Sequence, residues 1–261
     1  MAASAAHERL AAFGAQAAVV FGSGLEALPG GAVLEAELGY AELGWPCSAV
    51  PGHANVLRLV SGVAAGEARL RLALACGRPH TYEGWPGEEL GRPVRELAAA
   101  GIARVVFTNS TGSLRAEVAP GAVVVCHSVV DLQAPPSGAE PPRLAVCGAA
   151  AADRVAATLA ARGLTVRTGV YCAVAGPQFE TAAEVAWLAR SGDVVGMSAA
   201  PEVRAAAASG VECLLLALVA NRAAEVGSHD EVLERGALSA LDLSAGLGEA
   251  VTARWPGLVT V

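Results

Sequence analysis

Short runs of β-branched and aliphatic residues alternate with alanine-rich stretches along this chain, and this alternation limits the possible folds more than any other feature. Short apolar runs bounded by turn residues are typical of buried strands. Regular alternation of such strands with helices predicts an α/β domain built on parallel or mixed strands. The expected strands are residues 17–21, 69–76, 104–109, 121–130, 166–175, 193–197 and 211–221.

The alanine-rich stretches between these strands predict helices, several of which end in the glycine common after a helix C-terminus. The expected helices are residues 91–101, 150–163, 181–192, 201–210 and the tail from Ser228. Residues 133–143 hold four prolines and no large apolar residue, which predicts a mobile surface loop. Strand and helix signals continue in the same style on both sides of it, so we expect a single domain over residues 1–261.

Composition excludes several classes of function. Only 16% of the residues are charged and the net charge is -7, so no basic surface is available for nucleic acid. The six cysteines are scattered without a C-x-x-C pair, which argues against a zinc site or disulfides, and no other cluster has metal-ligand spacing. Charged residues near the N-terminus and the absence of a long apolar run argue against a signal peptide or membrane span. We therefore expect a cytoplasmic protein.

Polar or glycine-rich turns follow most of the expected strands. In an open α/β sheet, ligands bind at the carboxyl ends of the strands, so these turns should converge on one rim. In the first turn, Gly22 and Gly24 allow a tight bend that directs N–H groups at an oxyanion. The turns are "GSGLEAL" (22–28), "GRPHTYEGW" (77–85), "TNSTGSL" (108–114), "AGPQFETAAE" (175–184), "GMSAAPE" (196–202) and "ANRAAEVGSHDEV" (220–232).

The motifs "GSGL", "PGHA", "GRPHTYEG", "TNSTG", "GVYCAVAGPQFET", "VGMSAAPEV", "ANRA" and "SHDEV" occur in the order and approximate spacing found in the trimeric purine nucleoside phosphorylases. The chain resembles that family from about residue 17 to about residue 235. The resemblance implies a nucleoside phosphorylase-like fold, with a central mixed β-sheet flanked by helices, and a homotrimer. It implies phosphorolysis of inosine- or guanosine-type nucleosides to free purine and pentose 1-phosphate, with inorganic phosphate as co-substrate and no other cofactor.

For the phosphate, the resemblance implies a set of donors from separate turns. Arg78 suits an oxyanion because its planar guanidinium can donate two parallel hydrogen bonds, and histidines can adjust to the ionisation of phosphate near neutral pH. The implied phosphate-binding residues are Ser23, His53, Arg78, His80, the backbone N–H of Ser110, and Ser198.

For the base, the resemblance implies Glu180, Asn221 and Phe179, with His80, Asn221 and Glu180 as the catalytic groups. The Asn221 amide can donate to O6 of a 6-oxopurine and accept from N7 as that atom gains a proton. Glu180 can accept from N1–H, although a carboxylate at that position also suits a helix N-terminus. Tyr82, Met197 and His229 are implied to contact the ribose.

The sequence departs from the family pattern in three places. Glu26 occupies the last position of the motif usually written G-S-G-L-G, which places a carboxylate near the phosphate turn. The Pro-rich segment 133–143 has no aromatic residue where family members carry one that reaches the neighbouring subunit's ribose pocket. The loop between Asn221 and His229 is several residues shorter than usual. These departures predict an altered ribose site.

Three other functions stay open on the sequence. A methylthioadenosine-type phosphorylase would share the fold and the phosphate set but normally carries an aspartate at the position of Asn221. A nucleosidase would use water and have little need for Arg78, His80 and Ser198 together. A purine- or nucleoside-binding protein with weak or no turnover would keep the pocket only.

Overall fold

The computed structural model describes residues 2–65, 67–134, 141–225 and 250. Its strands are β1 (Ala17–Val20), β2 (Val33–Gly39), β3 (Val56–Ala65), β4 (Ala68–Cys76), β5 (Arg104–Ser113), β6 (Val123–Asp131), β7 (Arg143–Ala145), β8 (Val166–Ala173), β9 (Val194–Gly196) and β10 (Glu212–Arg222). Its helices are α1 (Ala2–Phe13), α2 (Tyr40–Leu43), α3 (Gly87–Leu90), α4 (Arg92–Ala99), α5 (Ala149–Ala160), α6 (Ala182–Leu188) and α7 (Ala200–Ala208), with a 3₁₀ turn at Thr81–Glu83.

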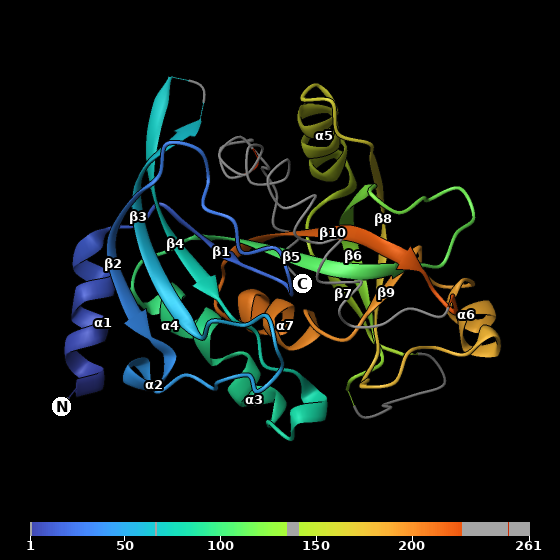
Figure 1. Cartoon of the computed structure of the whole chain (residues 1–261), viewed down its shortest axis with the longest axis horizontal. Helices are drawn as coiled ribbons and strands as arrows, with labels where there is room; N and C mark the ends of the chain where they lie inside the picture. The colour runs from blue at the N-terminus through green and yellow to red at the C-terminus, as the bar shows by residue number, and fades with distance from the viewer. Residues whose placement is uncertain (1, 66, 135–140, 226–249, 251–261) are drawn as a thin grey trace.

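The strands form one mixed sheet, in the order β10-β6-β8-β9-β5-β1-β4-β3-β2, with β7 paired to β6. Strand β10 also pairs with β5, so β5, β10, β6, β8 and β9 close into a ring, while β1, β4, β3 and β2 extend from it (Figure 1). The pairs β1–β4, β1–β5 and β5–β10 are parallel, and β2–β3 and β3–β4 are antiparallel. The structure confirms the predicted α/β class with a central mixed sheet.

Helices cover both faces of the sheet (Figure 1). Helix α5 packs Val155 and Leu159 into a core shared with β1, β4 and β10. Helices α1, α4 and α7 pack against the opposite face, where Leu10, Leu97 and Val203 are buried. Because both faces are covered, the central strands need continuous apolar runs, and all four residues of β1 are buried.

One edge of β5 is divided between two partners, and this division creates the space for a site. Strand β1 pairs with β5 up to Phe107, and β9 pairs with it only from Gly112. Residues 108–111 of β5 therefore face neither strand along that edge. Gly22, just after β1, lies directly against this stretch: a Cβ on it would be 2.6 Å from the Thr108 carbonyl oxygen, so a side chain cannot be accommodated.

All seven predicted strands and the four internal predicted helices are confirmed within a few residues. The sequence analysis did not predict α1, α2, α3, β2, β3 or β7, and residues 108–113, expected to form a turn, are the second half of β5. Strand β2 is largely exposed and carries Glu35 and Glu37, and β3 is interrupted by an irregularity between Val60 and Val63, so neither shows a clean strand pattern. The expected helix from Ser228 and residues 135–140 of the Pro-rich loop lie outside the described residues. Within the described ranges, no helix is long and apolar enough to cross a membrane.

Candidate active site

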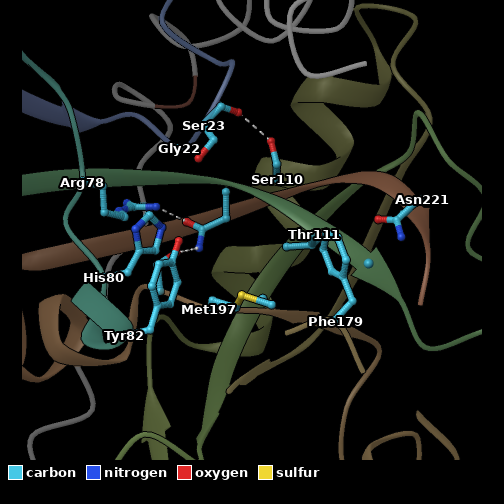
Figure 2. Close-up of a pocket in the computed structure, with 14 residues that line it drawn as sticks. Gly22, Ser23, Arg78, His80, Tyr82, Ser110, Thr111, Phe179, Met197 and Asn221 are labelled. Atoms are coloured by element: carbon cyan, nitrogen blue, oxygen red, sulfur yellow. Dashed lines mark hydrogen bonds between the residues drawn. The ribbon is translucent and has the colours of Figure 1, made fainter. Parts of the chain in front are cut away.

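A pocket lies beside residues 108–111 of β5, the stretch that neither β1 nor β9 pairs with, and contains about 630 Å³ of empty space, including its open mouth. Figure 2 shows Arg78, His80 and Tyr82 gathered at one end and Phe179 and Asn221 at the other. The lining residues are Gly22, Ser23, Arg78, His80, Tyr82, Asn109, Ser110, Thr111, Gly112, Phe179, Gly196, Met197, Ser198 and Asn221.

Arg78 follows β4 and is only 2% exposed. Its Nε donates to Glu202 Oε1 at 2.8 Å, and its Nη1 donates to the Thr108 carbonyl at 2.9 Å and to Asn109 Oδ1 at 2.7 Å. Its Nη2 donates to the Val20 carbonyl at 3.3 Å. These bonds use four of the five guanidinium N–H groups. In this conformation only one N–H group, on Nη2, is left for a ligand, together with the positive charge of the guanidinium. Arg78 therefore cannot donate the expected two parallel hydrogen bonds to an oxyanion.

Asn109 links Arg78 to the opposite wall of the pocket. Its Oδ1 accepts from Arg78, and its Nδ2 donates to Ser198 Oγ at 2.9 Å and to the Tyr171 hydroxyl at 3.1 Å. Ser198 Oγ accepts this bond, and the Ser198 side chain also contacts the Tyr171 hydroxyl. Ala199, the next residue, has a φ of 72°, a strained value for a residue with a side chain, and its N–H donates to Glu202.

His80 is fixed by a carboxylate from its own turn. Its backbone N–H donates to Glu83 Oε1 at 2.7 Å, and its Nδ1 lies 3.0 Å from the same oxygen. Nε2 is therefore the ring nitrogen available to a ligand. Burial would raise the pKa of Glu83, but hydrogen bonds from His80, the Ala49 N–H and Ser48 outweigh it and lower this pKa to about 2.

The turn after β1 reaches the pocket through Ser23. Ser23 Oγ lies 3.1 Å from His53 Nε2, and the Ser110 hydroxyl donates to the Ser23 carbonyl at 2.8 Å. His53 itself is behind Ser23 and does not line the pocket. The predicted phosphate-binding side chains Ser23, Arg78, His80 and Ser198 thus share one end of a single pocket, with His53 in contact from behind.

Asn221 reaches the other end of the pocket through an irregularity in β10. Thr111 pairs with Val219 and Gly112 with Asn221, so Ala220 is an extra residue in the strand. A bulge of this kind changes the direction of the side chains that follow it. Asn221 Nδ2 donates to the Arg222 carbonyl at 3.0 Å, which fixes the orientation of the amide. Its Oδ1 and its second N–H remain for a ligand. Phe179 lies nearby with 46% of its surface exposed (Figure 2).

Met197 lies between the two ends of the pocket, and Tyr82 lies next to His80 (Figure 2). The Tyr82 ring stacks on His80 at a centroid distance of 4.8 Å. Burial, with a smaller contribution from the Glu83 charge, raises the pKa of Tyr82 to about 12. Gly176 packs against both side chains with a φ of +72°, and a Cβ there would be 2.5 Å from Met197 Sδ. The backbone approach that shapes this part of the pocket therefore requires glycine.

Glu180, predicted to bind the base, does not line this pocket. Glu180 lies in the adjoining cavity, with Leu132, Trp187 and Leu188, although its neighbour Phe179 borders both spaces. Burial raises the pKa of Glu180 there. His229 lies outside the described residues. Among the described residues, no group of three or more histidine, cysteine or acidic side chains is placed to bind a metal ion.

The sequence analysis missed several residues that build the site, notably Asn109, Tyr171, Glu202 and Glu83. Asn109 had one detectable signal, because a polar residue in an apolar strand must have a reason to be buried. Glu202 lies 124 residues from its partner Arg78, and nothing local to either residue indicates the pair.

Comparison with known proteins places this fold and site in a family. The family model described as the phosphorylase superfamily matches residues 52–251. Purine nucleoside phosphorylase 1 of Bacillus subtilis is 33% identical over 236 residues, covering 83% of this chain and 84% of that protein. The purine nucleoside phosphorylase of Mycobacterium tuberculosis is 37% identical over 227 residues, covering 81% and 83%.

Bovine (Bos taurus) purine nucleoside phosphorylase is 31% identical over 251 residues, covering 87% of this chain and 85% of that protein. A crystal structure of schistosoma purine nucleoside phosphorylase in complex with hypoxanthine has the same fold, with a TM-score of 0.79 and 24% identity, covering 98% and 96% of the two chains. The chain is a member of the phosphorylase superfamily. Within that superfamily it belongs to the purine nucleoside phosphorylase family.

The low pKa of Glu83 predicts a specific pH dependence of stability. A carboxyl whose pKa is lowered on folding stabilises the folded protein above its unfolded pKa, here 4.5, and this contribution disappears as the pH falls through about 2. We expect Glu83→Gln to lower the free energy of unfolding at pH 6. The difference from the unmodified protein should shrink steadily below pH 4.5. Urea unfolding at several pH values measures it, with Glu89→Gln, which removes a partly exposed carboxylate paired with Arg92, as control. A constant difference across that range would show that the Glu83 charge does not contribute.

Proposed function

We propose that this protein catalyses the phosphorolysis of 6-oxopurine nucleosides such as inosine and guanosine. An oxygen of inorganic phosphate forms a bond to C1′ of the sugar as the bond from C1′ to N9 of the base breaks. The electron pair of that bond stays with the purine, which takes up a proton at N7. The products are the free purine and a pentose 1-phosphate.

One observation carries the proposal: the pocket joins hydrogen-bond donors suited to phosphate at one end to an amide suited to a purine at the other. Ser23, Arg78, His80 and Ser198 supply the first group and Asn221 the second. The space between them, lined by Tyr82 and Met197, then takes the sugar. In this arrangement phosphate lies beside C1′ and the base lies beyond it, which is the geometry that phosphorolysis requires.

The proposed catalysis depends on charge that develops as the glycosidic bond breaks. The sugar gains positive charge, which a phosphate anion held beside it stabilises. The purine gains negative charge, and the Asn221 carbonyl accepts from N7–H once that atom is protonated. That bond forms only as the base departs, so it lowers the barrier rather than merely tightening substrate binding. We assign His80 to phosphate, with its Nε2 as the contacting atom and Glu83 as the group that orients the ring.

Two assignments need more than the conformation described above. For Glu180 to accept from N1–H of the purine, its carboxylate must turn from the adjoining cavity into the pocket, and Phe179 would then cover the base. His229 is proposed to contact the 5′-hydroxyl on the resemblance alone. The homotrimer and the cytoplasmic location are proposed on the same basis.

Base release should require phosphate. We expect inosine and guanosine to give free base in phosphate buffer, with the rate falling to background without phosphate. Ser198→Ala should raise the KM for phosphate, and Arg78→Ala should lower turnover by about 100-fold or more, because a charged contact at the anion end is lost. The matched control is Arg92→Ala, which removes a partly exposed arginine that is paired with Glu89 and does not line the pocket. Equal rates with and without phosphate would reject the proposal.

Asn221 should determine the choice of base. A 6-oxopurine offers an acceptor at position 6 and a 6-aminopurine offers a donor, so the facing protein group must match. We expect the unmodified protein to prefer inosine to adenosine, and Asn221→Asp to shift the kcat/KM ratio toward adenosine by about tenfold or more, since an unmatched buried group costs about 1–3 kcal/mol. If the ratio stays the same, Asn221 does not face position 6.

A further inference from the structure

Glu26 lies at the end of the turn that carries Ser23, where the family motif usually ends in glycine, and its side chain is 15% exposed. Its Oε1 is 3.9 Å from Nδ1 of His53 and 3.5 Å from the Ala54 backbone nitrogen. The carboxylate thus joins the turn at residues 22–26 to the "PGHA" turn at residues 51–54. The first of these distances is that of an ion pair rather than of a direct hydrogen bond.

His53 lies between Glu26 and the pocket. Its side chain is fully buried, with Nδ1 toward Glu26 and Nε2 3.1 Å from the Ser23 hydroxyl oxygen. Ser23 in turn lines the phosphate end of the pocket. The Glu26 carboxylate, the His53 imidazole and the Ser23 hydroxyl therefore form a row of contacts, of which only Ser23 lines the pocket.

The other two basic side chains at this end of the pocket also have a carboxylate partner. Arg78 pairs with Glu202 at 2.8 Å, and His80 pairs with Glu83 at 3.0 Å. Glu26 gives His53 the equivalent partner. Each positive or protonatable side chain at the phosphate end thus has its own carboxylate behind it.

We propose that Glu26 is a positioning residue that keeps His53 protonated, so that the Ser23 hydroxyl donates its hydrogen to phosphate. This inference rests on the proposed phosphorolysis. It assigns to Glu26 a role in phosphate binding that acts through His53, without contact between Glu26 and the ligand.

The direction of the hydrogen bond between His53 and Ser23 determines whether the Ser23 hydroxyl presents its hydrogen or its lone pairs to phosphate. When His53 is protonated, its Nε2–H donates to Ser23 Oγ, and the Ser23 hydroxyl hydrogen is free to point at phosphate. When His53 carries a proton only on Nδ1, Nε2 accepts the Ser23 hydrogen, and Ser23 presents lone pairs to the phosphate oxygens. The first state attracts an anion and the second repels it.

Several charges act on His53, and Glu26 is the one placed to favour its protonation. The His80 ring is 5.6 Å from that of His53 between centroids, so a charge on His80 opposes a second one on His53, although Glu83 offsets it. Arg58 acts on Glu26 but is paired with Glu37 at 2.9 Å. A carboxylate at 3.9 Å from the ring nitrogen favours the charged imidazole.

The test is the KM for phosphate as a function of pH in Glu26→Gln, with inosine saturating. At pH 7.5 we expect this KM to rise about threefold to tenfold, because His53 loses its proton at a lower pH without the carboxylate. The difference should shrink as the pH falls and His53 becomes protonated in both proteins. The KM for inosine should change by less than about twofold. At each pH the phosphate in solution is ionised to the same extent for both proteins, so its ionisation does not contribute to the difference in KM.

Glu37→Gln is the matched control, since it removes a nearby carboxylate that pairs with Arg58 and not with His53. Glu26→Gly, which restores the usual family residue, should reproduce the effect of Glu26→Gln. In a His53→Gln background, Glu26→Gln should have no further effect. A phosphate KM that is the same in both proteins at every pH, or an effect that persists without His53, overturns the inference. Phosphate-independent base release by the unmodified protein would instead overturn the proposed function and this inference with it.

Discussion

The division of one edge of β5 between β1 and β9 is the constraint on which the rest of the site depends. Along this edge of β5, residues 108–111 have no strand neighbour, although the residues before and after them are paired with β1 and β9. A buried carbonyl left in this way must find another donor. Arg78 supplies it for Thr108, and the Gly22 N–H donates to the Thr108 hydroxyl at 3.2 Å. The gap that requires these side chains is also the space that a ligand can enter.

Placing a guanidinium in that gap has consequences for the surrounding structure. A buried charge is stable only when it is paired and hydrogen-bonded. Glu202, on α7 and 124 residues away in the sequence, supplies the carboxylate that pairs with Arg78. His80 likewise lies beside Glu83, and His53 lies beside Glu26. The end of the pocket that we propose for phosphate therefore has three basic side chains, each with a carboxylate next to it. This local arrangement occurs in a chain whose net charge is -7.

The sequence predicted the parts of this structure whose signal is local. Apolar runs located β1, β5 and β10, but the polar segment 108–113, which was expected to be a turn, continues β5. The exposed strand β2 has no such apolar run. Partnerships across the fold could not be predicted, because Arg78 and Glu202 meet only through the topology of the sheet. The position of Glu180 beside Trp187 likewise depends on how the segment before α6 packs, which its sequence does not specify.

The central claim is that phosphate at one end of this pocket attacks a nucleoside whose base lies at the other. The most direct measurement is phosphorus NMR of the reaction of inosine with inorganic phosphate, with the released base measured in the same sample. The account predicts that one equivalent of pentose 1-phosphate appears, and one equivalent of inorganic phosphate disappears, for each equivalent of hypoxanthine released. Release of hypoxanthine with free pentose and unchanged inorganic phosphate would contradict it.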